Sequence, residues 1–240
     1  MADMRSDTRG FIHVVTLALI LLVLVGLGMA AGIVAGYLKN APSVEDVDVE
    51  ARRVLPTVVY DANGDVLTKL KIEDRQWVRL ADIPQHLIDA VIAVEDHRFY
   101  EHHGISVRRI LGALWYDIRH LSDDQGGSTI TAQLARNVFL SHEKTISRKI
   151  WEALYAFQLE RRYTKDEILE FYLNWVYFGH GTYGVQAASN LFFGKPVDQL
   201  TLGEATLLAG IPKGNELYSP IKNEQTRQNG LNRRKIVLSR

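Results

Sequence analysis

The segment VEDHRFYEHHG, residues 94–104, gathers three carboxylates and three histidines at the end of the apolar run LIDAVIAV. Side chains of these types accept and donate protons, and they also bind metal ions. Three interpretations are open at this point. The segment could form a metal site, supply a general base, or be the solvated end of a helix.

Glu95 is the carboxylate whose spacing is most informative. It follows Val91 by four residues and Ile92 by three, so on a helix it extends the apolar stripe rather than the wet face. A carboxylate held partly out of water suits a general base near neutral pH. The structural alternative is a solvated carboxylate at a fraying helix end.

Glu152 is the second carboxylate of interest. It follows Arg148 by four residues and Lys149 by three, within a predicted amphipathic helix over residues 147–163. We expect Ile150 and Leu154 to mark the buried side of that helix. An ordinary surface ion pair between residues four apart is the alternative interpretation of Glu152.

The segment GGSTITAQLARN, residues 126–137, predicts a loop that leads into a helix. Its two glycines permit backbone conformations that are closed to other residues. Ser128 or Thr129 can cap the helix, whose first amides favour an anion. The polar and basic side chains nearby suit a phosphate or pyrophosphate group: Gln133, Arg136, Asn137, Lys144, Arg148 and Lys149. An ordinary glycine-containing loop is the alternative.

Several other kinds of chemistry are disfavoured. The His-Glu-x-x-His pattern of helical zinc hydrolases is absent, although His97 and Glu101 would share a helix face. Ser-x-x-Lys occurs at Ser141 and at Ser219, but without the further motifs that accompany it in serine acyltransferases. The chain has no cysteine, which excludes thiol catalysis, and its 28 basic and 28 acidic residues give no bias toward nucleic acid.

The elements that must position these residues are mostly helical. From Asp82, the expected N-cap of a helix with Pro84 in its first turn, apolar residues recur at helical spacing. The stripe of that first helix is Leu87, Ile88, Val91 and Ile92. Thr-x-x-Glu capping boxes begin two later helices, at Thr164 and at Thr201. A further amphipathic helix is predicted over residues 105–121.

The first 72 residues have a different character. An uncharged stretch between Arg9 and Lys39 exceeds the roughly 20 residues that cross a bilayer. It is too long for a simple signal peptide and lacks the polar face of a soluble core helix, so we expect an uncleaved transmembrane anchor. The flanking charges leave its orientation open. Two β-prone runs around Asp-Ala-Asn-Gly, within residues 56–72, predict a hairpin.

Taken together, these segments resemble the peptidoglycan glycosyltransferase family, the transglycosylase module of class A penicillin-binding proteins and of monofunctional cell-wall polymerases. Five family motifs occur in order over residues 95–238. The residues that match them are Glu95, Asp96, Phe99, His102, Gly104, Gly126, Ser128, Thr129, Ile130, Thr131, Gln133, Arg148, Lys149, Glu152, Lys165, Ile168, Leu169, Tyr172, Leu173, Asn174, Arg233, Arg234, Val237 and Leu238.

The resemblance implies a reaction and a set of site residues. Lipid II would be polymerised into glycan strands, with inversion at the donor C1 and release of polyprenyl pyrophosphate. Glu95 would deprotonate the acceptor hydroxyl, and Glu152 would support the donor. The residues implied to bind substrate are Asp96, Phe99, His102, Ser128, Thr129, Gln133, Arg136, Asn137, Lys144, Arg148, Lys149 and Asn174. No cofactor is obligatory, and a divalent cation, Mg²⁺ or Mn²⁺, near Glu152 is left open.

The implied architecture is a mainly α, lysozyme-like glycosyltransferase domain behind a single transmembrane helix and a short β-hairpin. The expected divisions are a tail (1–9), an anchor (10–38), a juxtamembrane linker (39–56) and the catalytic domain (57–240), which a transpeptidase domain would follow in bifunctional relatives. The resemblance places the domain on the extracytoplasmic face of the cell membrane. Its partners would be lipid II, the nascent glycan strand, the membrane and other cell-wall synthesis proteins, with no nucleic acid.

Two positions depart from the family pattern. Ala132 stands where a glutamine is frequent, and Trp151 stands where a polar or basic residue is common. Both departures concern the region expected to hold the donor. Two rival functions remain at this stage: a lysozyme-like hydrolase, which would have no use for the Lys144–Arg148–Lys149 cluster, and a membrane-anchored binding scaffold without turnover.

Overall fold

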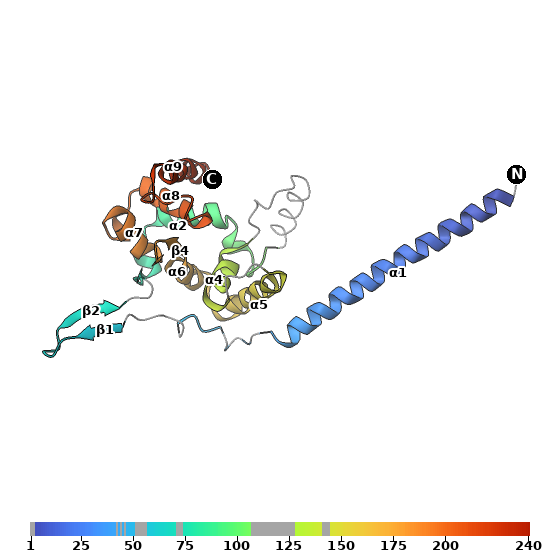
Figure 1. The fold of residues 1–240 in the computed structure, drawn as a ribbon, viewed down its shortest axis with the longest axis horizontal. Helices are drawn as coiled ribbons and strands as arrows, with labels where there is room; N and C mark the ends of the chain where they lie inside the picture. The colour runs from blue at the N-terminus through green and yellow to red at the C-terminus, as the bar shows by residue number, and fades with distance from the viewer. Residues whose placement is uncertain are drawn as a thin grey trace. The chain divides into compact units, whose positions relative to one another are not determined.

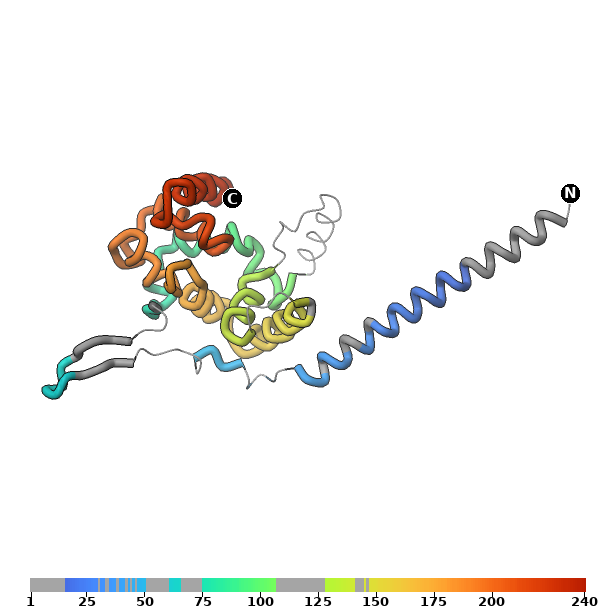
Figure 2. Tube along the Cα trace, viewed as in Figure 1, coloured from blue at the N-terminus to red at the C-terminus, as the bar shows by residue number. Residues whose placement is uncertain are grey.

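The computed structural model describes residues 3–41, 43, 45, 47–50, 57–70, 74–106, 128–140 and 145–240. By its internal contacts the chain divides into two compact units, residues 1–41 and residues 42–240. The course of the chain through its elements can be followed in Figures 1 and 2. All residues whose chemistry the sequence singled out belong to the second unit.

The first unit is one helix, α1 (Asp3–Lys39). Large apolar side chains along its middle, including Leu17, Leu22 and Met29, are more than half exposed. Judged by length and hydropathy together, none of the helices in the described part of the chain qualifies as a membrane span. The anchor over residues 10–38 stays a prediction.

The second unit is mainly α-helical, as the sequence predicted. Its helices are α2 (Gln85–Glu95), α4 (Ile130–Phe139), α5 (Ile146–Arg162), α6 (Lys165–Trp175), α7 (Val185–Phe193), α8 (Leu202–Gly210) and α9 (Glu224–Leu238). Its 3₁₀ turns are η2 (Leu80–Asp82), η3 (Phe99–Glu101), η4 (Val197–Gln199) and η5 (Ile211–Lys213). Its strands are β1 (Thr57–Tyr60), β2 (Val66–Leu70), β3 (Asp74–Arg75), β4 (Tyr177–Gly179) and β5 (Thr182–Tyr183).

Two groups of helices share one hydrophobic core. Helix α8 packs against both α9 and α2, and helix α4 packs against both α5 and α6 (Figure 1). Each group contributes fully buried leucines, among them Leu87 of α2, Leu134 of α4, Leu173 of α6 and Leu208 of α8. Because α2 and α4 belong to this core, the ends of these two helices are held in a fixed relation to each other.

Five of the seven α-helices of the second unit begin at a residue whose side chain caps the first turn, and the exceptions among these described helices are α2 and α7. Capping boxes at Thr164 and Thr201 are both present, as predicted. The prediction of Asp82 as the N-cap of α2 is wrong. Helix α2 is preceded by Pro84, which makes no side-chain cap, and the Asp82 carboxylate instead accepts a 2.8 Å hydrogen bond from Arg79 Nε. Pro84, predicted in the first turn, is itself the N-cap residue, and Asp82 ends the 3₁₀ turn η2 two residues earlier.

A segment before α2 is fastened along α6. Strand β3 pairs in parallel with β5, which pairs antiparallel with β4. The Arg75 guanidinium lies 3.7 Å from the centre of the Trp175 ring. The Glu170 carboxylate then accepts hydrogen bonds from Trp77 Nε1 (3.1 Å) and from the Leu80 amide (2.8 Å). These contacts fix the point from which the chain enters α2.

Part of the segment expected as a juxtamembrane linker, residues 39–56, belongs to the core of the second unit. Val47 and Val49 are completely buried. The Val49 amide donates to the Tyr163 hydroxyl at 3.3 Å, and the Arg162 guanidinium pairs with Asp48 at 2.9 Å. Residues 47–49 therefore pack onto the second unit through the two valine side chains and through the pair between Asp48 and Arg162.

Strands β1 and β2 pair antiparallel, with Thr57 opposite Leu70. In the turn between them the Asp61 carboxylate accepts hydrogen bonds from the amides of Asp65 and Asn63. These bonds favour the ionised form and hold the pKa of Asp61 below its usual value.

Three predicted features fall outside the described residues. They are the helix over residues 105–121, from residue 107 onward, the glycine pair Gly126 and Gly127, and the predicted anion-binding Lys144.

Candidate functional site

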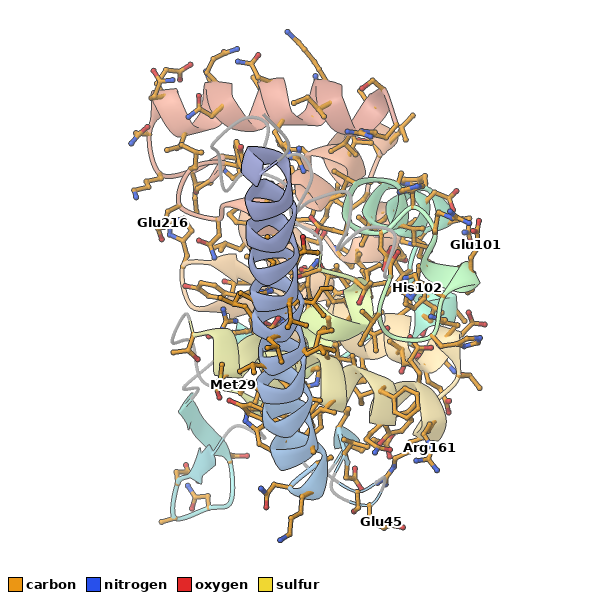
Figure 3. All side chains as sticks on the ribbon, turned by 90° about the vertical axis from the view of Figure 1, so that its right-hand side faces the viewer. Met29, Glu45, Glu101, His102, Arg161 and Glu216 are labelled. Atoms are coloured by element: carbon orange, nitrogen blue, oxygen red, sulfur yellow. The ribbon has the colours of Figure 1, made fainter. Side chains whose placement is uncertain are left out.

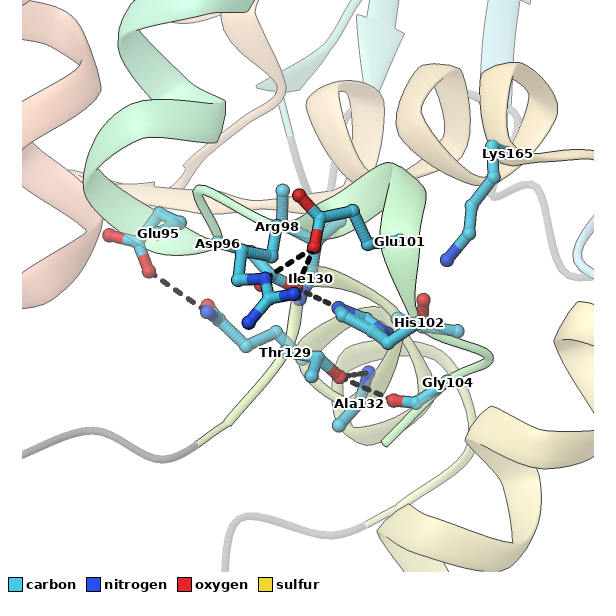
Figure 4. Close-up of polar contacts among 12 residues, drawn as sticks. Glu95, Asp96, Arg98, Glu101, His102, Gly104, Thr129, Ile130, Ala132 and Lys165 are labelled. Carbon is cyan, nitrogen blue, oxygen red and sulfur yellow. Dashed lines mark hydrogen bonds and ion pairs between the residues drawn. The ribbon is translucent and has the colours of Figure 1, made fainter. Parts of the chain in front are cut away.

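The end of helix α2 and the side of helix α4 meet at Glu95. Gln133, one turn into α4, donates a 2.8 Å hydrogen bond from Nε2 to Glu95 Oε2 (Figure 4). Glu95 is partly buried, in line with its predicted place on the apolar stripe after Val91, which is 4% exposed. The residue is half-buried, its Oε1 atom is shielded from solvent, and the Gln133 amide fixes the direction of the carboxylate.

Asp96, which follows Glu95 as the C-cap of α2, is completely buried. Its Oδ2 accepts hydrogen bonds from the Ile130 amide at 3.1 Å and from His102 Nε2 at 2.8 Å (Figure 4). The Ile130 amide is the first of helix α4, where a carboxylate is favoured by the helix dipole. Asp96 therefore connects the end of α2 to the start of α4, and the His102 ring is hydrogen-bonded to the same carboxylate oxygen. Figure 3 shows His102 next to Glu101 among the side chains of the second unit.

Thr129 and Gly104 add a second tie between the same two segments. Thr129 is the N-cap of α4, as expected: its Oγ1 accepts from the Ala132 amide at 3.1 Å and donates to the Gly104 carbonyl at 2.5 Å (Figure 4). Gly104 has a φ of +83°, and a Cβ there would lie 2.9 Å from the Ala156 carbonyl oxygen of α5. A glycine is therefore required for α5 to approach this loop.

Glu152 is the buried carboxylate of a cluster of charged side chains on α5. It is 2% exposed, its Oε1 is paired with Arg148 Nη1, and its Oε2 accepts from Lys149 Nζ at 2.8 Å. Lys149 Nζ also donates to Ser128 Oγ at 3.0 Å, which links α5 to the segment before α4. The Lys149 side chain is 54% exposed, so the cluster presents one cation to solvent.

The buried face of α5 differs from the predicted one. Glu152, Ala156 and Leu159 are buried, whereas the expected marker residues Ile150 and Leu154 are partly exposed. The predicted residues Ile150 and Leu154 and the observed residues Glu152, Ala156 and Leu159 both have helical spacing. The helix was therefore predicted correctly, but a different face of it is buried. A carboxylate whose two oxygens are both held by cations can occupy the inner face.

Two of the predicted site residues hold the scaffold. Phe99 is completely buried, with the ammonium of Lys165 4.4 Å from its ring centre. Asn174 is also completely buried. Its Oδ1 accepts from the Val78 amide at 2.9 Å, and its Nδ2 donates to the carbonyls of Val78 and Glu170, each at 2.8 Å. Three of the four hydrogen bonds that its amide can make are thus with the protein's own backbone.

Arg136 and Asn137 lie one turn beyond Gln133 on α4, and both are partly exposed. Residues three and four apart share a face of a helix, so they continue the polar side that Gln133 begins. The structure therefore brings together Glu95, Asp96, His102, Ser128, Thr129, Gln133, Arg148, Lys149 and Glu152, from α2, α4, α5 and the segments next to them.

A buried polar group beneath the site was not predicted. Glu160 of α5 accepts from Thr131 Oγ1 at 2.6 Å and from Lys165 Nζ at 2.8 Å, and its side chain is 6% exposed. Lys165 is labelled in Figure 4, beside the loop that carries His102. These residues join α4, α5 and α6, and no local pattern in the sequence connects them.

Tyr172 of α6 is a second unpredicted contact. It is 1% exposed, and its hydroxyl donates to Gln133 Oε1 at 3.3 Å. Burial in the core, followed by the negative charge of Glu95, raises the pKa of Tyr172 well above its usual value. Its sequence separation from Gln133 hid the contact, although Tyr172 lies within the fourth motif.

Metal binding finds no support in this part of the protein. Across the described residues there is no group of three or more His, Asp or Glu side chains that could hold a metal ion. Both oxygens of Glu152 are already engaged by Arg148 and Lys149.

Comparisons with known proteins agree on one family. A family model described as Transglycosylase matches residues 63–240. Penicillin-binding protein 2D of Bacillus subtilis is 46% identical over 197 residues, which cover 82% of this chain and 27% of the relative. Penicillin-binding protein 1A of Escherichia coli is 42% identical over 220 residues, which cover 91% of this chain and 25% of the relative. The chain thus spans about a quarter of the length of these relatives.

Solved structures are also similar to this chain. The crystal structure of penicillin-binding protein 1A from Haemophilus influenzae aligns with a TM-score of 0.40 and 26% sequence identity. The alignment covers 77% of this chain and 18% of that one.

Proposed function

Because the chain belongs to the transglycosylase family, whose activity is that of a peptidoglycan glycosyltransferase, we propose that it polymerises lipid II into glycan strands. One observation carries the proposal. A half-buried carboxylate, Glu95, is joined through α4 and its flanking segment to the buried, cation-bound carboxylate Glu152. A transfer to a sugar with an anionic leaving group needs a base on one side and cations on the other.

Glu95 is the proposed general base. It removes the proton from the 4-hydroxyl of the acceptor sugar, and the hydroxyl oxygen attacks C1 of the donor sugar. The new oxygen–C1 bond forms on the face opposite the breaking C1–O bond, so the configuration at C1 inverts. The electron pair of the broken bond leaves with the polyprenyl pyrophosphate. The Gln133 amide holds the Glu95 carboxylate in the direction of this attack.

The charge cluster on α5 is the proposed site of the leaving pyrophosphate. Glu152 fixes Arg148 and Lys149 from below, and the exposed side of Lys149 is available to phosphate oxygens. Preorganised cations at the point where negative charge develops lower the barrier without reorganising during the reaction. Ser128, Arg136 and Asn137 border the same region in this proposal, and Lys144 is proposed for it by resemblance alone.

The mechanism proposed here is written without a divalent cation. The predicted Mg²⁺ or Mn²⁺ at the donor pyrophosphate stays a prediction. Polymerisation after treatment with EDTA tests it. Activity that falls and returns with added Mg²⁺ would support metal use, and unchanged activity would contradict it.

Membrane attachment is a further part of the proposal. The uncharged residues 10–38 would anchor the chain, with the catalytic domain on the extracytoplasmic face, where a lipid-linked donor is consumed. Other cell-wall synthesis proteins are proposed partners. A transmembrane anchor is extracted by detergent and resists carbonate. Release of the chain from cell membranes by carbonate alone would therefore contradict an anchor of this kind. Digestion of the domain by protease added to intact spheroplasts would support its outer position.

Polymerisation of fluorescent lipid II by the detergent-solubilised chain tests the function. We compare the wild type with Glu95→Gln, Glu152→Gln and a matched control, Glu216→Gln, in an exposed ion pair with Lys222. We expect long products from the wild type and the control, and a loss of about 10²–10⁴-fold with Glu95→Gln, the usual contribution of a general base. A folded wild type that binds lipid II without making polymer would contradict the proposal and favour a scaffold. Shortening of preformed glycan strands would indicate a hydrolase.

A further inference from the structure

The contact between Tyr172 and Gln133 joins the interior of helix α6 to the candidate base. Tyr172 is one of the largest fully buried side chains, and its hydroxyl reaches Gln133 Oε1 at 3.3 Å. Gln133 Nε2 reaches Glu95 Oε2 at 2.8 Å. The three side chains come from α6, α4 and α2, and they form one chain of donors and acceptors.

The direction of this chain is fixed by chemistry. An amide side chain has an oxygen that accepts and a nitrogen that donates, and it can in principle be turned by 180°. With its oxygen toward Glu95, Gln133 would oppose a carboxylate with a second acceptor. With its nitrogen toward Glu95, its oxygen needs a donor on the other side. The Tyr172 hydroxyl is that donor.

Tyr172 is suited to this role at every working pH. Burial raises its pKa well above the usual value, so the hydroxyl keeps its proton. The side chain is 1% exposed, so water does not compete for the hydroxyl. Its neighbours in α6 are held by the capping box at Thr164 and by the hydrogen bonds of Asn174. Because the Tyr172 hydroxyl is a donor held in a fixed position, it favours one orientation of the Gln133 side-chain amide.

We propose that Tyr172 is a positioning residue for the Glu95 carboxylate, and that it acts by locking the orientation of the Gln133 amide. The inference rests on the proposed function of Glu95 as a base. It assigns Tyr172 no contact with substrate, since its side chain lies in the core. It predicts that the Tyr172 hydroxyl affects the rate of the chemical step and leaves lipid II binding unchanged.

Tyr172→Phe removes the hydroxyl and keeps the ring. We expect kcat to fall about 10-fold, within the range of small misplacements of a reacting group, with KM for lipid II unchanged within about twofold. Tyr163→Phe is the matched control, because the Tyr163 hydroxyl also bonds to a residue distant in the sequence, accepting from the Val49 amide. We expect the control to keep full activity. Urea unfolding of all variants separates effects on the site from effects on folding.

A double-mutant cycle decides whether Tyr172 acts through Gln133. Gln133→Met keeps the approximate shape of the side chain and removes both hydrogen bonds. In that background Tyr172→Phe is expected to cause less than a twofold further loss of kcat, because the amide that it orients is absent. A full additional 10-fold loss, an effect on KM in place of kcat, or a fully active Tyr172→Phe would overturn the inference.

The side-chain amide resonance of Gln133 provides a readout that needs no turnover. In protein labelled with ¹⁵N-glutamine, both Tyr172→Phe and Glu95→Gln are expected to shift this resonance, and Tyr163→Phe is expected to leave it in place. A resonance that ignores Tyr172→Phe would overturn the inference. An inactive wild type in which Tyr172→Phe shifts the resonance would instead contradict the proposed function and leave the contact established.

Discussion

Glu95 and Glu152 are two glutamates at the same candidate site, but their surroundings differ in every respect. Glu95 ends helix α2, is partly exposed and is held by a neutral amide, Gln133. Glu152 lies within helix α5, is 2% exposed and has both oxygens held by cations. A group that exchanges protons with a substrate must be reachable, whereas a group that fixes other charges is best sealed. The contrast supports the proposed roles more strongly than either carboxylate does by itself.

The two carboxylates also differ in what holds their helices. Glu95 depends on a junction between chain segments, in which Asp96 binds the first amide of α4 and Thr129 binds the Gly104 carbonyl. Glu152 depends on residues one turn away in its own helix, Arg148 and Lys149. The position of Glu95 is therefore sensitive to changes in several elements, and that of Glu152 to changes within α5. Substitutions next to Glu95 and next to Glu152 should therefore have different effects on activity and on stability.

Among the substitutions that test this comparison without changing either glutamate, Gln133→Glu is expected to have the largest effect. It replaces the neutral amide beside Glu95 by a second carboxylate, 2.8 Å away in the present geometry. Two carboxylates this close share a proton at neutral pH, so the site loses a base ready to accept one, and we expect activity to fall about 100-fold. The measurement is the initial rate of lipid II polymerisation. Gln225→Glu, the same change on exposed α9, is the control, and equal losses in the two variants would break the comparison.

Arg148→Met tests the sealed carboxylate. The Arg148 side chain is 12% exposed, so its removal leaves the buried Glu152 with one of its two cations. We expect a loss of about 3 kcal/mol in the free energy of unfolding, the range for breaking a buried pair. Urea denaturation followed by circular dichroism measures the change. Arg227→Met removes an arginine from an exposed pair with Glu224 and should cost less than about 1 kcal/mol. Similar losses for both arginines would show that burial of the cluster contributes little.

How far the sequence predicts this arrangement depends on the range of each interaction. Thr164 and Thr201 were predicted as caps, and Thr129 as one of two candidates with Ser128, because the partners of a cap lie within three residues. Asp82 failed as a cap because Arg79, equally near, provides a competing partner. Local patterns thus identified the caps of α4, α6 and α8, missed Thr145 and Asn223, and failed at Asp82.

Unlike the helix caps, the inner face of α5 and the contacts of Tyr172 depend on residues far apart in the sequence. Hydrophobicity alone assigned Ile150 and Leu154 to the core, but the packing of α5 against α4 buries Glu152 instead. The Tyr172–Gln133 bond joins residues 39 positions apart. Both features arise from the docking of whole helices, which no single stretch of sequence encodes. The resemblance named Glu95 and Glu152, whereas the structure supplies the residues that hold them.

Lys149→Met separates the two cations of the cluster and is expected to have a smaller effect on folding than Arg148→Met. The Lys149 side chain is 54% exposed, so its pair with Glu152 is screened by water and should contribute less than about 1 kcal/mol. Its exposed ammonium is the proposed contact of the pyrophosphate, so we expect about a 10-fold or larger loss of kcat. Polymerisation kinetics and urea unfolding measure the two effects. Lys222→Met, which breaks the exposed pair with Glu216, should change neither.

Glu204→Gln is expected to have the smallest effect, because this carboxylate lies outside the site. Glu204 accepts a 2.8 Å bond from Lys195 and also closes the capping box of α8 with Thr201. These contacts, the Lys195 hydrogen bond above all, lower its pKa from 4.5 to about 2. A carboxyl whose pKa is lower in the folded state stabilises the protein above its unfolded pKa, and the contribution disappears as the pH falls toward the folded value.

Glutamine keeps the capping box but removes the charge, so at pH 7 we expect a loss of about 1 kcal/mol, as for other solvent-screened pairs. The difference in stability between wild type and variant should shrink between about pH 4.5 and pH 2, and polymerisation at pH 7 should be unchanged. Urea unfolding across this pH range provides the measurement. A difference that persists at pH 2 would show that glutamine disturbs α8 itself. A loss of polymerisation would show that charge outside the Glu95 and Glu152 pair also controls the site.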